Sequence, residues 1–453
     1  MCCITDKPTE ACGVMAILGP GGPVAGDIYG GLFCLQHRGQ QSAGIATANE
    51  GEVFLHKNLG LVTEVFTPTA LEGLPGRMGI GHVHYATQRN NTPEDAQPLR
   101  ITHAKGELCV AYNGNITNSA VLRQGLADAG AVFQTHSDVE LIAHQIARVT
   151  GAGDIAEALT LALPSLKGAY SLVAMSNNRL FAARDPHGFR PLCIGRRDKT
   201  WIIASESCAF GLLEAQFVRD VAPGEVLELT NDGPVTLTQI PNDPTICVFE
   251  YIYFARPDSF IDGTSVYQAR HDAGRFLAQQ SPVEADLVVG VPDSGIICAI
   301  GYAAESGIPY GLAFDKNRYI GRTFIAPTQR MREQAVRMKL SVINENVRGK
   351  RIIMTDDSIV RGTTCAKIIK LLKAAGAKEV HVRISSPPYK WPCYFGTDIS
   401  DRDQLTANTH SLEELCTLLG ADSLAYLNQE SLPDILATKA GFCQGCFTGN
   451  YPK

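Results

Sequence analysis

The chain has 453 residues and a formal net charge of −6 at pH 7, which predicts two or three globular domains and excludes a general attraction to nucleic acid or anionic membranes. No apolar run is long enough to span a bilayer, and the polar first residues lack the apolar core of a secretory signal, so we expect a cytoplasmic protein. In a reducing cytoplasm, the 14 cysteines are expected in the core, in catalysis or on a metal rather than in disulfides.

The first half of the chain carries a series of motifs within strand and helix patterns. In chain order they are Cys12–Gly19, Leu35–Gly44, Gly79–Thr87, Tyr112–Asn118 and Thr135–Glu140. This ordered series resembles the glutaminase domain of the class II amidotransferases. The paired strand runs, with helices on their outer faces, predict an α/β/β/α sandwich of the N-terminal-nucleophile type over residues 12–231.

The resemblance implies roles for several residues in these motifs. Cys12 would be the nucleophile, and its own α-amino group, with an ordinary pKa of roughly 8, would be the base. A free amine requires cleavage before Cys12, so residues 1–11 would be a propeptide. Asn113 and the backbone N–H of Gly114 would form the oxyanion hole. Two further charged residues would help to hold the glutamine: Arg38 and Asp138.

The glutamine motifs depart from the family pattern at two positions. The family's usual His-Val-Arg-Tyr has become His-Val-His84-Tyr, and a histidine lacks the two parallel donors with which arginine grips a carboxylate. We still expect His84 in the glutamine site, with Arg89 able to supply the missing charge. Tyr112 stands where the family usually has a histidine.

Turn-rich sequence over residues 231–244 marks a junction, so we expect a second domain over residues 245–453. Apolar runs at Asp286–Gly290, Pro309–Phe314, Arg351–Thr355 and Val380–Ser386 alternate with helical patterns. This alternation predicts a parallel sheet. Ligands of such sheets bind at the carboxyl ends of the strands.

The stretch Arg351–Thr364 combines a buried strand, two adjacent carboxylates, and small hydroxyl residues before a helix. Small residues and a helix N-terminus favour a phosphate, and the carboxylates suit ribose hydroxyls and hydrated Mg²⁺. The stretch resembles the signature of type I phosphoribosyltransferases. The resemblance implies a phosphoribosylpyrophosphate site formed by Asp293, Asp356, Asp357, Ser358, Val360, Arg361, Gly362, Thr363 and Thr364. It also implies a Mg²⁺ site formed by Ser294, Asp356 and Asp357.

A basic segment broken by Gly and Pro, residues 316–339, lies between these motifs. It is either a solvated surface or a lid that closes over pyrophosphate and excludes water. Three of its residues are candidate contacts for purine nucleotides: Lys316, Arg318 and Lys339.

The tail is expected to be helical from about Ser411 to Ala440, and it ends with a Cys-x-x-Cys pair. Four thiolates suit an iron–sulfur cluster or a structural zinc equally by chemistry alone. The contexts of four cysteines resemble those of the family's [4Fe–4S] ligands and favour the cluster: Cys247, Cys393, Cys443 and Cys446.

Taken together, these motifs resemble the glutamine phosphoribosylpyrophosphate amidotransferase family, of the iron–sulfur type with a propeptide, over nearly all of the chain. The resemblance implies an enzyme that transfers glutamine-derived ammonia to phosphoribosylpyrophosphate in purine synthesis. It also implies a homo-oligomer, a tetramer by resemblance, inhibited by purine nucleotides. Two alternatives remain open: an ammonia-dependent transferase with an impaired glutaminase site, and a non-catalytic nucleotide or phosphoribosylpyrophosphate sensor.

Overall fold

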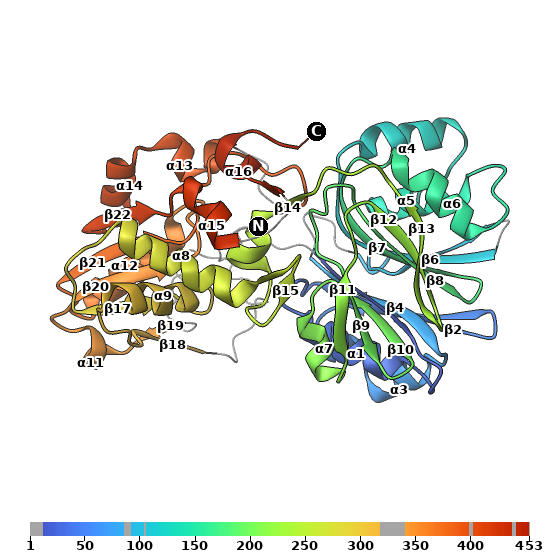
Figure 1. The fold of residues 1–453 in the computed structure, drawn as a ribbon, viewed down its shortest axis with the longest axis horizontal. Helices are drawn as coiled ribbons and strands as arrows, with labels where there is room; N and C mark the ends of the chain where they lie inside the picture. The colour runs from blue at the N-terminus through green and yellow to red at the C-terminus, as the bar shows by residue number, and fades with distance from the viewer. Residues whose placement is uncertain are drawn as a thin grey trace.

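The computed structural model describes residues 12–85, 92–103, 106–317, 340–397, 402–436 and 441–452. These residues form two units side by side, the N-terminal one on the right of Figure 1 and the C-terminal one on the left. Within this described part of the chain, no helix has the length and apolarity needed to cross a membrane.

The N-terminal unit contains two antiparallel sheets. The first has the order β11 (Gln216–Asp220), β9 (Cys193–Arg197), β10 (Thr200–Ala204), β1 (Gly13–Leu18), β4 (Met78–His84), β2 (Ser42–Asn49), β3 (Glu52–Leu59). The second has the order β13 (Gly233–Gln239), β12 (Glu225–Thr230), β8 (Arg179–Arg184), β7 (Gly168–Ser176), β6 (Gly106–Ile116), β5 (Leu99–His103).

Alternating side chains of each strand separate the layers of this unit. In β1, Val14 and Ala16 join the apolar core between the two sheets, whereas Met15 and Ile17 join a core beneath the helices of the first sheet. Those helices are α1 (Ala25–Cys34), α2 (Val62–Val65), α3 (Pro68–Glu72) and α7 (Cys208–Leu212). The second sheet is covered by α4 (Ser119–Asp128), α5 (Asp138–Ala147) and α6 (Ile155–Ala162), followed by the turn η1 (Leu163–Ser165). The predicted α/β/β/α sandwich is confirmed.

The C-terminal unit is built on a parallel sheet, as predicted. Its order is β17 (Leu287–Gly290), β20 (Arg351–Asp356), β21 (Glu379–Ile384), β22 (Ser423–Tyr426). The helices α8 (Val266–Gln280) and α9 (Ile296–Ser306) pack on one face. On the other face lie α12 (Thr363–Ala374) and α14 (Leu412–Leu419).

The prediction of an all-helical tail is wrong at β22. Ser423–Tyr426 pairs with β21 in parallel, with His381 opposite Ser423, and extends the sheet by one strand. A run of four residues is too short to reveal its period, so helix and strand could not be separated from its sequence. The Pro309–Phe314 run also contributes little strand, because only Tyr310 bridges to Val288.

Short elements join the two units and the tail. The strand β14 (Thr245–Cys247), which begins the second unit, pairs in parallel with β23 (Gly441–Cys443) near the end of the chain. The π-helix η2 (Glu250–Phe254) follows β14 at the junction. The remaining short elements are β15 (Phe260–Ile261), β16 (Thr264–Ser265), β18 (Phe314–Lys316), β19 (Leu340–Val342), α11 (Asn344–Val347), η3 (Arg402–Gln404), α13 (Thr406–Thr409), η4 (Gln429–Ser431), α15 (Leu432–Leu436) and α16 (Gly445–Thr448).

Candidate active sites

Cys12 meets two histidines at one end of the first sheet. It directly precedes β1, where Gly13 pairs with Val83 of β4, so His82 and His84 lie on either side of that partner. The Cys12 sulfur is 3.3 Å from Nδ1 of His84. His82 is fully buried, and its Nε2 lies 3.1 Å from the carbonyl oxygen of Tyr112, to which an Nε2–H donates. The sheet register therefore places an ordered pair of imidazoles beside the predicted nucleophile.

The imidazoles change the acidity of the thiol. Burial by itself raises the pKa of Cys12, but the nearby His84 and His82 outweigh it and hold the pKa well below its ordinary value. Burial lowers the pKa of His84, yet the adjacent Cys12 sulfur raises it above its usual range. Burial lowers the pKa of His82. This pattern favours a thiolate–imidazolium pair between Cys12 and His84, beside a neutral His82.

The predicted oxyanion residues lie in β6, on the other sheet. Asn113 is fully buried, and neither atom of its side-chain amide has a hydrogen-bond partner within the described residues. Gly114 has φ +152°, and a Cβ there would lie 1.9 Å from the Ala169 carbonyl oxygen. Only glycine fits this position. An unpaired buried amide beside a glycine of the same strand is suited to receive a charged oxygen.

Asp138 lies at the start of α5 and is tied to the same strand. It accepts a hydrogen bond from the Tyr112 hydroxyl and another from the backbone N–H of Ile116, the latter at 3.3 Å. Burial raises the pKa of Asp138. The tyrosine at the unusual position therefore orients the carboxylate predicted to hold glutamine.

Arg38 is held by two buried carboxylates. Its side chain is buried, and its guanidinium is bound to Glu206 and, at 2.9 Å, to Glu250. Its Nε donates to the Cys12 carbonyl oxygen at 3.2 Å. These contacts give Arg38 a positioning role next to the nucleophile, and a direct contact with glutamine stays a prediction.

The two units share a buried charged network around Glu250, which belongs to η2. Arg190 of the first unit donates to Glu250 at 3.0 Å and to the Phe395 carbonyl oxygen at 2.8 Å. The backbone N–H of Arg256 and the Ser259 hydroxyl both donate to Glu206. Two arginines and two glutamates, Arg38, Arg190, Glu206 and Glu250, are thus buried together at the junction, where removing one partner is costly.

The transferase motifs meet at the carboxyl edge of the parallel sheet, as predicted. Gly290 is paired with Thr355, so the loops after β17 and β20 begin at the same level. Asp356 and Asp357 are buried, and the Ser358 hydroxyl donates to Asp357 at 2.7 Å. The carboxyl edge of the sheet therefore carries the adjacent Asp356 and Asp357 carboxylates, and Asp357 orients the Ser358 hydroxyl.

The loop from Ser358 to Gly362 leads into α12. Gly362 has φ +76°, the left-handed region that lets the chain turn into the helix. The Val360 carbonyl oxygen accepts hydrogen bonds from the backbone N–H and hydroxyl of Thr406, and Arg361 donates to Gln404 at 2.6 Å. Elements of the tail hold this loop, while the hydroxyl residues Thr363 and Thr364 begin the helix. Such an N-terminus is suited to a phosphate.

The loop after β17 carries the predicted pyrophosphate contacts. Gly295 packs so closely that a Cβ would lie 2.4 Å from the Thr355 carbonyl oxygen, and the Thr355 hydroxyl donates back to the Gly295 carbonyl at 2.7 Å. Asp293, beside Ser294, is exposed and pairs with Lys316. Of the three basic residues expected to contact nucleotides, Lys316 alone is described; Arg318 and Lys339 lie outside the described residues, as do Arg89 and the proposed propeptide.

The four predicted cluster cysteines line a single small cavity. Cys247 is opposite Cys443 in the β14–β23 pair, and Cys393 and Cys446 complete the lining together with Phe249, Tyr389 and Tyr451. All four cysteines are free thiols. Zinc would draw its sulfurs to within about 3.8 Å of one another. Among the described residues, no three of these sulfurs lie within 4.8 Å of one another, so they are spaced more widely than the sulfurs around a bound zinc ion.

Comparisons with known proteins agree with both halves of this description. Residues 84–211 match the glutamine amidotransferase domain family, and residues 264–385 match the phosphoribosyl transferase domain family. The amidophosphoribosyltransferase of Archaeoglobus fulgidus is 48% identical over 448 residues, which cover 97% of this chain and 98% of that protein. The amidophosphoribosyltransferase of Bacillus subtilis is 47% identical over 451 residues, covering 98% and 94%. This chain belongs to the amidophosphoribosyltransferase family.

A solved structure of the B. subtilis glutamine phosphoribosylpyrophosphate amidotransferase, complexed with ADP and GMP, matches this chain with a TM-score of 0.92 at 46% identity, covering 97% of each chain. The protein is a glutamine-dependent pentosyltransferase. It releases ammonia from glutamine and transfers it to phosphoribosylpyrophosphate, which gives 5-phosphoribosylamine and pyrophosphate, the first committed step of purine synthesis.

The sequence did not reveal the residues that join the two units of this protein. Glu250 and Arg190 are fully buried and carry opposite charges across the junction. Glu250 interrupts the apolar run Ile246–Phe254, and a lone carboxylate in such a run is a signal for a buried partner. The sequence offers no such signal for which arginine is the partner.

Proposed function

We propose that glutamine hydrolysis follows the assignments made to the first unit. Once residues 1–11 are removed, the free α-amino group of Cys12 takes the proton that Cys12 shares with His84, and the sulfur attacks the amide carbon. Asn113 and the Gly114 N–H receive the developing oxyanion, and the C–N bond breaks as the amine proton leaves with ammonia. Water then hydrolyses the thioester on Cys12, which releases glutamate and restores the thiol. Asp138, oriented by Tyr112, binds the α-ammonium of the substrate. The observation that supports this most directly is the unpaired, fully buried amide of Asn113.

The second unit supplies the transfer step. Residues 358–364 hold the 5′-phosphate at the start of α12, and Asp293 lies with the pyrophosphate. Asp356 and Asp357 stabilise the positive charge that develops on the ribose as pyrophosphate leaves. Oxygen donors from Asp356, Asp357 and Ser294 are the ligand type that Mg²⁺ takes, and the ion would neutralise the leaving pyrophosphate.

The convergence of four free cysteines on one cavity supports a [4Fe–4S] cluster held by Cys247, Cys393, Cys443 and Cys446. Its role is structural: it ties β14 at the start of the second unit to the loop at Cys393 and to the tail. The cluster takes part in no step of the reaction.

Three broader assignments rest on family membership. The enzyme is cytoplasmic, it forms a homotetramer, and purine nucleotides inhibit it by occupying the phosphoribosyl site. Lys316, Arg318 and Lys339 are the proposed contacts for those nucleotides, and the ion pair of Lys316 with Asp293 supports the assignment of Lys316.

A steady-state assay of pyrophosphate release, run in parallel with glutamine and with ammonium, tests the whole assignment. Cys12→Ser is expected to abolish the glutamine reaction and keep the ammonium reaction, whereas Asp357→Asn should abolish both. The intact mass of the active protein should correspond to a chain that begins at Cys12. A fully glutamine-active protein that retains residues 1–11 would contradict the amine as base.

A further inference from the structure

Cys12, the proposed nucleophile, lies in a cluster of three potential metal ligands, and the proposed reaction assigns no role to His82. The sulfur of Cys12 and one ring nitrogen from each of His82 and His84 lie within 4.8 Å of one another. Around a tetrahedral zinc ion, sulfur and nitrogen ligands would be about 3.5 Å apart and nitrogen pairs about 3.3 Å. The Cys12–His84 separation of 3.3 Å is already close to that value.

A hydrogen bond orients the His82 ring as in many metal-binding histidines. Its Nε2–H donates to the Tyr112 carbonyl oxygen, which leaves the lone pair on Nδ1. Nδ1 is fully buried and has no hydrogen bond of normal geometry within the described residues, while the ring interacts with the Cys12 sulfur. Metal-binding histidines commonly donate their second ring N–H to a carbonyl in this way.

His84 provides the third ligand only because it is not arginine. A guanidinium has no lone pair to offer and would place a fixed positive charge next to a cation. The imidazole at position 84 has a lone pair, and the Asp95 carboxylate lies close enough to stabilise positive charge there. The departure from the family pattern therefore changes an anion-binding position into a cation-binding one.

We propose that Cys12, His82 and His84 form a zinc site that reversibly blocks the glutamine half of the enzyme. One thiolate and two imidazoles are a borderline-soft set that suits Zn²⁺ and excludes Mg²⁺, and the fourth position stays open to water. The ion replaces the proton shared by Sγ and Nδ1, and that proton passes to solvent. The blocking effect rests on the proposed role of Cys12 as nucleophile; the binding itself does not.

Alkylation of the holoenzyme tests binding. The protein is treated with iodoacetamide with and without stoichiometric Zn²⁺, and the modification rates of Cys12 and Cys34 are measured by peptide mass mapping. Both cysteines are partly exposed, so Cys34 is an internal control. Zn²⁺ is expected to slow alkylation of Cys12 and leave Cys34 unchanged. Equal rates at Cys12 with and without Zn²⁺ would overturn the site.

Two variants test the ligands. His84→Arg removes a proposed zinc ligand. Changes to residues that only support the ligands lower metal affinity by roughly 10- to 100-fold, so this variant should need at least that much more Zn²⁺ to protect Cys12. The exposed His136 gives the matched control His136→Gln, which should keep full protection. Unchanged protection in His84→Arg would overturn the assignment.

Activity of the unmodified enzyme tests the block. With saturating Mg²⁺, Zn²⁺ should abolish pyrophosphate release with glutamine, leave release with ammonium unchanged, and be reversed by a chelator. An equal fall of both rates would place the zinc at the transferase site and overturn the proposal. Protection of Cys12 without loss of the glutamine rate would uphold the metal site and remove Cys12 from the reaction.

Discussion

A single histidine at position 84 determines what the glutamine pocket can bind. His84 contacts the nucleophile at 3.3 Å where relatives are expected to have an arginine for the substrate carboxylate. Loss of a charge-assisted, bidentate pair weakens binding by roughly 1.5–3 kcal/mol, or about 10- to 150-fold. Glutamine is therefore expected to bind weakly unless another cation reaches its carboxylate.

The first prediction is that His84→Arg lowers the KM for glutamine by about 10- to 150-fold in zinc-free buffer. The arginine would restore the bidentate pair with the glutamine carboxylate. The KM is measured from steady-state pyrophosphate release. The ammonium reaction, which uses only the second site, is the control. Arg89→Ala in the unmodified chain should abolish glutamine use if Arg89 supplies the missing charge. Ordinary glutamine affinity that survives Arg89→Ala would contradict both explanations.

The second prediction concerns a half-buried acid, Asp220, at the end of β11. Burial and the neighbouring Asp262 raise the pKa of Asp220 to about 7, above the unfolded value of about 3.9. Between about pH 4 and pH 7, Asp220 is therefore protonated in the folded protein and charged in the unfolded chain. Protonation of Asp220 stabilises the folded state fully below about pH 4, and this stabilisation is lost as the pH rises to about 7. Asp220→Asn keeps the uncharged form.

We expect Asp220→Asn to raise the melting temperature at pH 8 and to raise it much less at pH 5. Thermal unfolding at the two pH values measures the difference. The exposed Asp232 gives the control Asp232→Asn, for which no such difference is expected. A variant that is less stable at pH 8 than the unmodified protein would show that the charged carboxylate is stabilising.

At the scale of elements, the pairing of β14 with β23 brings together residues almost 200 positions apart in the chain. It sets Cys247 opposite Cys443, and Phe395, which follows Cys393, stacks on Phe189 of the first unit at a centroid separation of 4.1 Å. A group held by the four cysteines would therefore anchor the tail to both units.

The third prediction is that Cys443→Ser loses iron and sulfide. Protein purified without oxygen should contain both elements and absorb broadly in the visible range, because four thiolates bind the cluster. The variant should lose the absorption and melt at a lower temperature. Cys416→Ser, a thiol outside the cavity, is the control. Stoichiometric zinc without sulfide would replace the cluster with a zinc site.

Much of this organisation could be predicted from the sequence, because local pattern and chemistry coincide there. The Arg351–Thr364 stretch specifies a strand, a turn and a helix N-terminus, and the structure forms all three. The strand β22 escaped prediction because its four residues show no period. The partners of Arg38 also escaped prediction, because Glu250 lies 212 positions away and no local rule links them.

At the scale of the whole molecule, the two sites are joined through charge rather than through an apolar interface alone. Glu250 accepts hydrogen bonds from Arg38 and Arg190, and Arg38 in turn holds the Cys12 carbonyl. A second pair, Arg184 with Asp262 at 2.7 Å, also joins the two units. The position of the nucleophile thus depends on a residue of the transferase unit.

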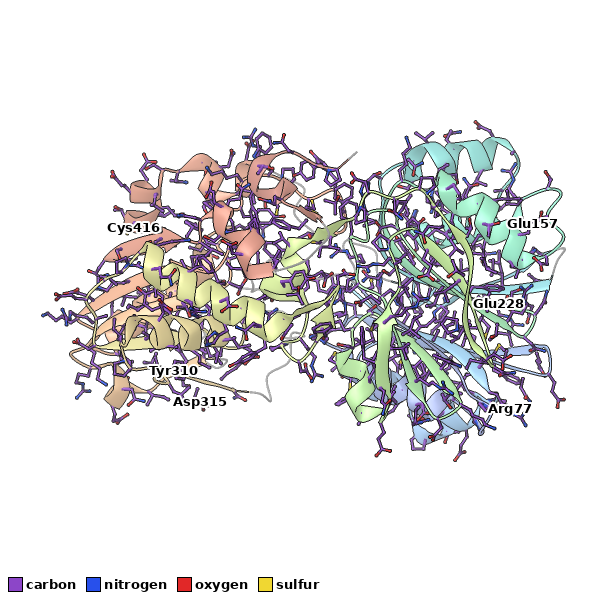
Figure 2. The ribbon with its side chains drawn as sticks, viewed as in Figure 1. Arg77, Glu157, Glu228, Tyr310, Asp315 and Cys416 are labelled. Atoms are coloured by element: carbon purple, nitrogen blue, oxygen red, sulfur yellow. The ribbon has the colours of Figure 1, made fainter. Side chains whose placement is uncertain are left out.

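The last prediction follows from this dependence. Glu250→Gln keeps the shape of the side chain but leaves two buried arginines with one carboxylate fewer, and breaking such a pair is worth about 3–5 kcal/mol. We expect a lower melting temperature and a glutamine reaction that falls much more than the ammonium reaction. The control is Glu228→Gln, because Glu228 pairs with Arg179 on the outer side of the first unit, away from the junction (Figure 2). Equal losses of the two reactions would mean that Glu250 supports the fold without positioning Cys12.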